Sequence, residues 1–303
     1  MSVSLSFVLI LFLFYKGKIV AGDGNLTGII KVFNEHGVLE RTIDNAHSSS
    51  INRLKLLPNG LMASASSDKS VKIWNTFDWS LIRTYTQHTQ WTLGLEYIRE
   101  DTIASGSGDG TIQIWSVSSG TTLSTIQVGS EVRALQMLPT GMLASGDQKG
   151  EIKLWTIDSG SLAQTLKGHT NCINDLALVN NDQMLASSSK DTTVRLWDFR
   201  AGAGIRVLSC HTNWVCGLKA ISSTLMASAS WDKTIKIWDS TSGALVKTLT
   251  GHTNSIVNSL DLLSESVLVS GSRDRTIKLW NVSSGQVSKT IQANMEICCL
   301  IVI

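Results

Sequence analysis

The stretch LMASASWDKTIKIWD, at residues 225–239, contains two short runs of alternating apolar and polar residues separated by a polar turn. The runs Leu225–Ala229 and Thr234–Trp238 are too short for helices, and their alternation is typical of half-buried β-strands. Another apolar-rich run precedes them at Trp214–Ile221, and another alternating run follows at Ala244–Leu249. This part of the sequence therefore predicts a unit of four short antiparallel strands.

The same unit recurs along nearly the whole chain. The third run of each copy ends on an aromatic residue, and successive closing residues are 40 to 42 positions apart. These residues are Phe33, Trp74, Trp115, Trp155, Trp197, Trp238 and Trp280. One four-stranded unit leaves two sheet faces uncovered, whereas units arranged radially bury those faces against one another. We therefore predict an all-β fold, a seven-bladed β-propeller with four antiparallel strands per blade, in a single domain over residues 1–303.

Composition limits the kinds of ligand to expect. The formal net charge is +2, from 26 basic and 24 acidic residues, which argues against a dedicated nucleic-acid surface. The five cysteines form an odd set with no CxxC spacing, so they predict neither a disulfide framework nor a zinc site. We expect no metal, no cofactor and no small-molecule substrate, and we expect the thiols to be small buried side chains in a reducing compartment.

Short motifs in the units resemble those of the WD40-repeat family. Gly168-His169 and Gly251-His252 match the family's GH pair, and Trp197-Asp198 and Trp238-Asp239 match its WD pair. Leu185–Ser187 matches its second strand. The resemblance covers nearly the whole chain and implies a closed propeller in which the last strand of each blade is outermost.

A second pattern makes the resemblance specific. In five units a histidine is followed 17 or 18 residues later by serine, then four later by aspartate, then six later by tryptophan. The sets are His47-Ser64-Asp68-Trp74, His88-Ser105-Asp109-Trp115, His169-Ser187-Asp191-Trp197, His211-Ser228-Asp232-Trp238 and His252-Ser270-Asp274-Trp280. The resemblance implies that each set forms a hydrogen-bonded chain within its blade, and the donors and acceptors of the four residue types suit such a chain.

Histidine, serine and aspartate also occur together in hydrolases. An enzyme needs one site, whereas this constellation occurs five times at a fixed phase, which is typical of a scaffold. The histidines lie in separate units and are not expected to bind a metal together. We therefore predict no catalytic residue among them.

Two units depart from this pattern. The fourth has Gly129-Ser130 where the family has GH followed by threonine, and Lys149 where the turn aspartate would stand, although it keeps Ser145 and Trp155. The first unit lacks the histidine and has phenylalanine as its closing residue. We expect these two blades to be the less stable ones.

The two ends of the sequence offer competing strands. Ser2–Tyr15 is the most apolar stretch, and three interpretations stay open for it: the inner strand of the first blade, a signal peptide, or a membrane segment. Residues 295–303 have the phase of an additional inner strand, so Glu296–Val302 competes with Ser6–Phe14 for the same position. The sequence leaves open which of the two closes the ring.

Some large residues lie outside the repeat phase. Trp91 and Trp214 each stand three residues after a pattern histidine, while Lys190, Trp231 and Arg273 each directly precede a turn aspartate. Burial between blades does not account for these positions, and the resemblance implies that partners dock on the face that carries them. Exposed tryptophan and arginine side chains are typical of binding hot spots. We predict that these five residues bind a protein partner, the alternative being local packing against loops.

The sequence is consistent with three functions. The main hypothesis is a non-catalytic scaffold for protein–protein interactions, a recognition or assembly subunit of a larger complex, located in the cytoplasm or alternatively in the nucleus. The second is an enzyme with a site in the central channel, for which Arg53, Glu131 and Arg133 are the candidates. The third is a scaffold attached to a membrane through residues 2–15.

Overall fold

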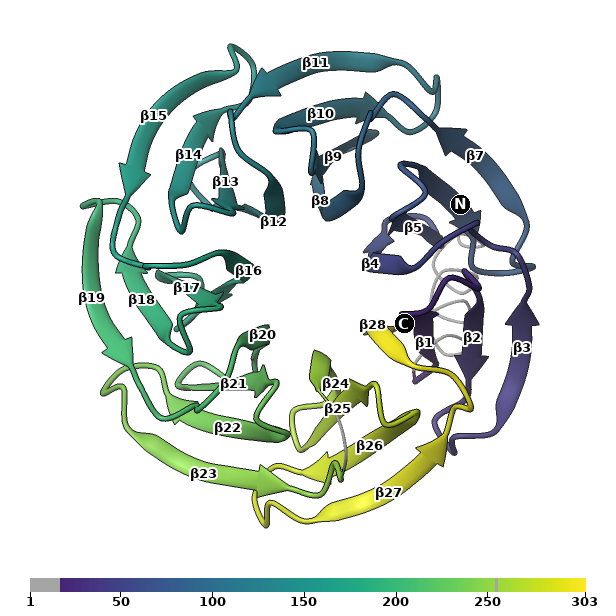
Figure 1. The fold of residues 1–303 in the computed structure, drawn as a ribbon, viewed down its shortest axis with the longest axis vertical. Coiled ribbons are helices and arrows are strands. Elements are labelled where there is room, and N and C mark those ends of the chain that lie inside the picture. Colours follow the sequence, from purple (N-terminus) through teal and green to yellow (C-terminus); the bar gives the residue numbers. More distant parts are fainter. Residues whose placement is uncertain (1–16, 254–255) are drawn as a thin grey trace, which may run out of the picture.

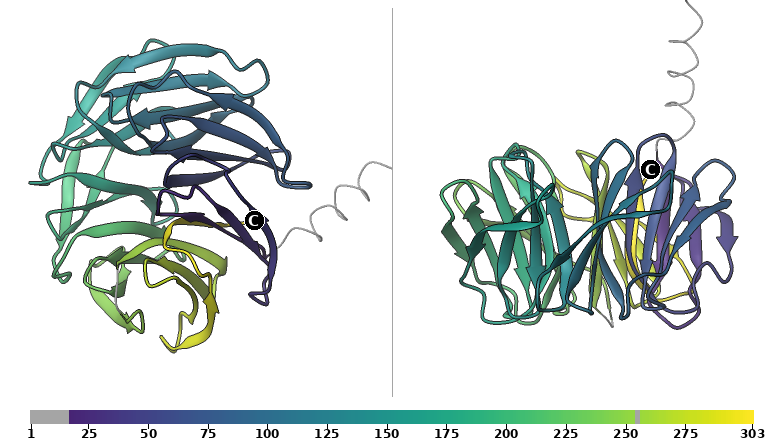
Figure 2. Two further views of the ribbon diagram at one scale, coloured as in Figure 1. Left: turned by 45° about the vertical axis from the view of Figure 1, so that its right-hand side comes forward. Right: turned by 90° about the horizontal axis from the view of Figure 1, so that it is seen from above.

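The computed structural model describes residues 17–253 and 256–303, and confirms the predicted architecture. These residues form 28 strands in seven four-stranded antiparallel sheets arranged around a central channel (Figure 1). In the side view the strands run between the two faces of a flat disc (Figure 2). Within the described ranges there is no helix of the length and hydropathy needed to cross a membrane.

Each blade runs outward from an inner strand at the channel to an outer strand at the rim. The second and third blades are β4 (Ile51–Leu57), β5 (Leu61–Ser66), β6 (Val71–Asn75) and β7 (Leu81–Tyr85), then β8 (Thr92–Arg99), β9 (Thr102–Ser107), β10 (Thr111–Ser116) and β11 (Thr122–Gln127). The fourth and fifth blades are β12 (Val132–Met137), β13 (Met142–Asp147), β14 (Ile152–Thr156) and β15 (Ser161–Leu166), then β16 (Ile173–Val179), β17 (Met184–Ser189), β18 (Val194–Asp198) and β19 (Ala203–Leu208). The sixth and seventh blades are β20 (Val215–Ala220), β21 (Leu225–Ser230), β22 (Thr234–Asp239) and β23 (Leu245–Thr250), then β24 (Val257–Ser264), β25 (Val267–Ser272), β26 (Thr276–Asn281) and β27 (Val287–Gln292).

The first blade combines both ends of the chain. Its strands, from the channel outward, are β28 (Ile297–Val302), β1 (Ile19–Asp23), β2 (Ile30–Phe33) and β3 (Leu39–Ile43). The register pairs Ile19 with Val302 and Val20 with Ile301. The C-terminal strand therefore closes the ring, as the two yellow and purple ends in Figure 1 show.

This closure answers the question that the sequence left open. The inner position that we considered for Ser6–Phe14 is occupied by β28. The physical reason is that β1 has one inner edge, and its backbone groups already pair with residues 297–302. Residues 2–15 themselves lie outside the described residues. The signal-peptide and membrane interpretations concern this same stretch of the chain.

The closing tryptophans hold neighbouring blades together. Trp115 of the third blade packs with Ala63, Val71 and Ile73 of the second, and the other closing tryptophans from Trp197 onward repeat this contact with the preceding blade. Trp115 is 1 % exposed. Burial of about 200 Å² of apolar surface contributes up to roughly 5 kcal/mol per tryptophan. The core is thus a ring of contacts between blades.

Candidate partner-binding face

Two kinds of segment meet on one face of the disc. They are the loops that lead into each inner strand, and the turns that join the second and third strands of each blade. We call this side the turn face. A backbone hydrogen bond joins the two kinds of segment. The Lys190 N–H donates to the Cys172 carbonyl (2.9 Å), and the Trp231 N–H donates to the Trp214 carbonyl (2.9 Å). Two positions far apart in sequence thereby become neighbours.

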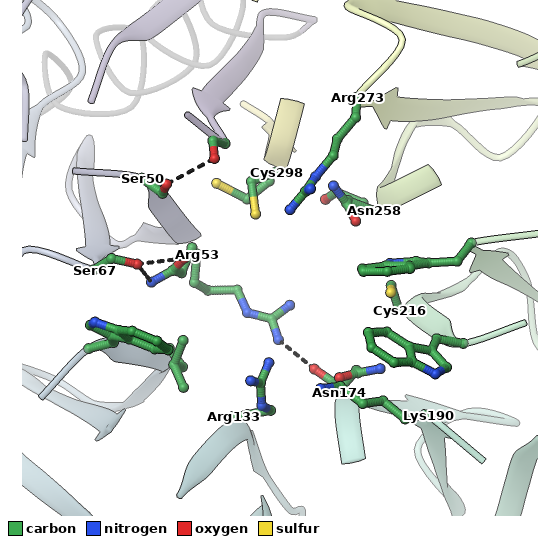
Figure 3. A pocket seen from close by; sticks show the side chains of 18 residues that line it. Ser50, Arg53, Ser67, Arg133, Asn174, Lys190, Cys216, Asn258, Arg273 and Cys298 are labelled. Atoms are coloured by element: carbon green, nitrogen blue, oxygen red, sulfur yellow. Dashed lines mark hydrogen bonds between the residues drawn. The ribbon is translucent and has the colours of Figure 1, made fainter. Parts of the chain in front are cut away.

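The five residues predicted to bind a partner all line one pocket on this face. The pocket has a volume of about 400 Å³ and lies at the mouth of the central channel (Figure 3). Trp91 comes from the third blade, Lys190 from the fifth, Trp214 and Trp231 from the sixth, and Arg273 from the seventh. The structure thus places them around a common opening, which the sequence could suggest only through their shared repeat positions.

Four of these side chains form one column. The Trp214 and Trp231 ring centroids are 4.2 Å apart, with 39° between the ring planes. The Lys190 ammonium lies 4.4 Å from the Trp214 ring centroid, and the Arg273 guanidinium carbon lies 5.9 Å from that of Trp231. Each cation–π contact contributes about 0.5–1 kcal/mol at a partly exposed site. We call this column the cation–tryptophan stack.

Trp91 lies outside the stack. Its side chain is 51 % exposed, and it lines the pocket from the third blade. The two stacked tryptophans are half-buried instead. Trp214 and Trp231 therefore show part of the local packing that we considered as the alternative to partner binding, whereas Trp91 is largely exposed.

An ion pair crosses the channel beneath the pocket. Arg53 on β4 reaches Asp175 on β16, with 3.0 Å between Nη2 and Oδ1, and also donates to the Asn174 carbonyl (Figure 3). Burial alone would lower the pKa of Arg53, but the Asp175 carboxylate raises it above its ordinary value. Arg53 also lines a second pocket, of about 320 Å³, deeper in the channel. This arginine therefore takes part in the lining of both pockets.

The candidate enzyme residues are also held in ion pairs. Arg133 Nε lies 2.6 Å from Glu131 Oε1, and Arg53 is bound to Asp175. In the deeper pocket, which sequence reasoning did not single out, Glu96 lies 2.7 Å from Lys55. Burial raises the pKa of Glu96, while Lys55 opposes that shift. Two of these pairs start from β4, which carries both Arg53 and Lys55. Among residues 17–253 and 256–303 no three His, Cys, Asp or Glu side chains gather as a metal site would require.

Three thiols at the pocket were not singled out from the sequence. Cys216 on β20 and Cys298 and Cys299 on β28 line it, and all five cysteines of the chain are unbridged. Burial raises the pKa of Cys216 to about 12 and raises that of Cys299 as well, so both thiols stay protonated at neutral pH. Their pocket position follows from the inner-strand register, which only the folded ring reveals.

A hydrogen-bonded chain anchors the turns that carry the stack. In the sixth blade the Trp238 indole N–H donates to Ser228 Oγ (2.8 Å), Ser228 lies 2.8 Å from His211 Nε2, and His211 Nδ1 lies 2.7 Å from Asp232. Because the indole N–H only donates and a carboxylate only accepts, Ser228 accepts from Trp238 and the Nδ1–H of His211 donates to Asp232. In the neutral imidazole Nε2 then accepts from the serine hydroxyl. Asp232 also accepts from the Thr212 backbone N–H (3.1 Å), which ties the turn to the loop.

The same four-residue chain is present in the other four blades that carry the pattern. Its distances are 2.7–2.8 Å from tryptophan to serine, 2.6–2.8 Å from serine to histidine, and 2.7–2.9 Å from histidine to aspartate. Burial alone would raise the pKa of Asp274, but hydrogen bonds from His252 and Thr276 lower it to about 2. Burial lowers the pKa of His47 and His88, although their aspartates oppose the shift.

The fourth blade uses a different arrangement. Trp155 still donates to Ser145 (2.8 Å), but the carboxylate comes from Asp147, two residues before Lys149. Asp147 accepts from the Lys149 and Glu151 backbone N–H groups (both 2.9 Å) and pairs with Lys153 at 3.2 Å. A buried ion pair thus takes the place of the histidine–aspartate pair.

Comparison with known protein families identifies the family to which the chain belongs. The model of the family described as WD domain, G-beta repeat matches residues 37–75, 79–116, 160–198, 202–239 and 243–281, which together are more than half of the sequence. A seven-bladed propeller of four-stranded units with this turn chemistry is the architecture of that class. The chain belongs to the WD40-repeat family.

Curated relatives match shorter parts of the chain. DDB1- and CUL4-associated factor 13 of Dictyostelium discoideum is 29 % identical over 35 % of this chain and 25 % of its own length. The nuclear distribution protein PAC1 of Fusarium vanettenii is 38 % identical over 38 % and 28 %. The 26S proteasome regulatory subunit RPN14 of Saccharomyces cerevisiae is 42 % identical over 22 % and 16 %. The matched part is in each case less than a third of the relative.

Proposed function

We propose that this protein is a non-catalytic interaction scaffold, a recognition or assembly subunit of a multiprotein complex, and that its partner docks on the turn face. The observation that carries the proposal is the gathering of Trp91 and the cation–tryptophan stack around one pocket. Tryptophan and arginine are enriched in the residues that contribute most to protein–protein binding. Two relatives support the assembly role, because their names describe a proteasome subunit and a factor associated with other proteins.

The position of the stack favours docking. Its members come from three consecutive blades and are fixed by backbone hydrogen bonds and by the hydrogen-bonded chains behind the turns. Binding therefore costs little side-chain ordering, which favours affinity. The unbridged thiols support a location in the cytoplasm, with the nucleus as the alternative.

Affinity capture from cells tests this function. The native chain is compared with a Trp91→Ala/Trp214→Ala/Trp231→Ala variant, after urea unfolding has shown that both are folded. Phe77→Ala is the matched control, because Phe77 is a 60 % exposed aromatic residue in a turn on the opposite face. We expect a partner that binds the native chain and the control and is lost from the triple variant. Identical captures from all three would contradict docking on the turn face.

A further inference from the structure

The turn-face pocket is lined by charges of one sign. Its lining includes four cationic side chains, those of Arg53, Arg133, Lys190 and Arg273, and no carboxylate (Figure 3). Arg53 and Arg133 are compensated by carboxylates at 3.0 Å and 2.6 Å. The remaining two cations are those of the cation–tryptophan stack.

The stack cations have little compensation of their own. Arg273 has its nearest carboxylate, that of Glu296, at 3.9 Å, and its side chain is 38 % exposed. For Lys190 the structure gives a contact with the Trp214 ring and no ion pair among the described residues. The positive charge that is available to a ligand therefore sits at the two ends of the stack.

The geometry of the stack disfavours other ligands at Trp214 and Trp231. Lys190 lies against Trp214, the two indoles lie against each other, and Arg273 lies against Trp231, so the stack itself offers no broad indole face to a nucleic-acid base or a second cation. A purely apolar segment would cover both cations without pairing them, and an unpaired charge is costly to remove from water. A ligand with carboxylates meets neither obstacle.

The separation of the two cations indicates an extended ligand. Lys190 and Arg273 are on opposite sides of the stacked indoles, on the fifth and seventh blades (Figure 3). A single small anion would reach one of them, whereas a peptide presents acidic side chains at intervals. We propose that the stack binds an acidic, extended peptide segment of the partner, with carboxylates paired to Lys190 and Arg273 and apolar atoms against the indole edges. This inference rests on the proposed docking function and specifies the chemistry of the partner.

Fluorescence anisotropy with defined peptides tests this chemistry. The full chain is titrated into a labelled peptide of repeated Glu-Asp-Leu units and into the same peptide with Gln-Asn-Leu units. We expect the acidic peptide to bind at least roughly tenfold more tightly than the amide peptide, and its affinity to fall as salt is raised, because pairs at an exposed rim are screened. Equal affinities for the two peptides, or no binding of the acidic one, would overturn the proposal.

Charge-reversal variants locate the binding. Lys190→Glu/Arg273→Glu is expected to lower the affinity for the acidic peptide by about tenfold or more. The same variant should bind a peptide of Lys-Lys-Leu units instead, which a misfolded chain would not do. The control Arg200→Glu/Lys247→Glu changes the net charge equally, but it alters an exposed turn on the opposite face and the outer strand β23. An equal loss in this control, or tighter binding of a thymidine oligonucleotide than of the acidic peptide, would overturn the inference.

The two proposals fail in different ways. If affinity capture depends on Trp214 and Trp231 but is unchanged by Lys190→Glu/Arg273→Glu, docking on the turn face stands and the acidic chemistry is wrong. If capture is unchanged by every variant on this face, the docking function itself is wrong.

Discussion

The fourth and sixth blades have the same four-strand outline but anchor their turns differently. The sixth blade uses a chain of hydrogen bonds from Trp238 to the Asp232 carboxylate, in which each polar atom is matched by a donor or acceptor and no lysine takes part. The fourth blade keeps the serine–tryptophan bond and adds a lysine–aspartate pair, with Asp147 fully buried and the Lys153 side chain 13 % exposed. One architecture thus tolerates two kinds of interior chemistry, and they should respond differently to the loss of one partner.

The largest effect is expected in the fourth blade. Asp147→Ala would leave the mostly buried Lys153 ammonium with the Val128 carbonyl and the more exposed Glu151 carboxylate at 3.4 Å. Breaking a buried ion pair in this way costs roughly 3–5 kcal/mol of unfolding free energy. Urea unfolding measures the loss. Asp147→Ala/Lys153→Met is the control, because removal of both charges should recover most of the stability; an Asp147→Ala midpoint equal to that of the native chain would show that the pair is not needed.

A smaller effect is expected in the sixth blade. Asp232→Ala removes an acceptor for His211 but leaves no buried charge, so the unfolding free energy should fall by about 1–3 kcal/mol. The turn that carries Trp231 also loses its bond to the Thr212 N–H. A loss as large as that of Asp147→Ala, measured in the same urea series, would remove the distinction between the two blades.

The smallest effect is expected from mild acid. The pKa of His47 and of His88 lies below the ordinary value of 6.5 because burial disfavours the imidazolium. The unfolded chain therefore takes up protons first, so stability is full above pH 6.5 and declines as the pH falls below it. The aspartates, whose pKa lies below 3.8 in the folded chain, still keep their contribution in this range. Urea unfolding at pH 7.5 and at about pH 5.5 measures this decline.

A matched variant isolates the histidine contribution. His47→Gln/His88→Gln removes both titrating groups, so its unfolding free energy should change less between the two pH values than that of the native chain. The fourth blade has no histidine and does not contribute. If the unfolding free energies of both proteins changed equally with pH, titratable groups other than His47 and His88 would be responsible for the change.

The sequence predicted the fold because its signals are local and repeated. Alternation in segments such as Thr234–Trp238, and aromatic residues about 41 positions apart, are visible without any tertiary information. Trp91 and Trp214 could be singled out for the same reason, because the other repeat units have smaller residues at the same position.

Contacts across the ring could not be predicted in this way. The pairing of Arg53 with Asp175 joins blades that are three apart, and nothing in either repeat unit encodes the width of the channel. Likewise, Asp147 takes over a role from a position two residues later, which only the shape of the folded turn makes available. That β28 takes the inner edge of β1 could not be predicted either, because two apolar segments of the sequence had the phase of that strand.

The strand that closes the ring has a consequence for biosynthesis. A ribosome adds residues 297–302 after every other strand of the propeller, yet their place is beside β1, which emerges among the first. During translation the first blade therefore waits with an unpaired inner edge while six complete blades form behind it, and such edges are prone to pair with other chains. A nascent chain that stalls before its last strand would expose this edge and the apolar residues around Ile19, which is the kind of surface that chaperones bind.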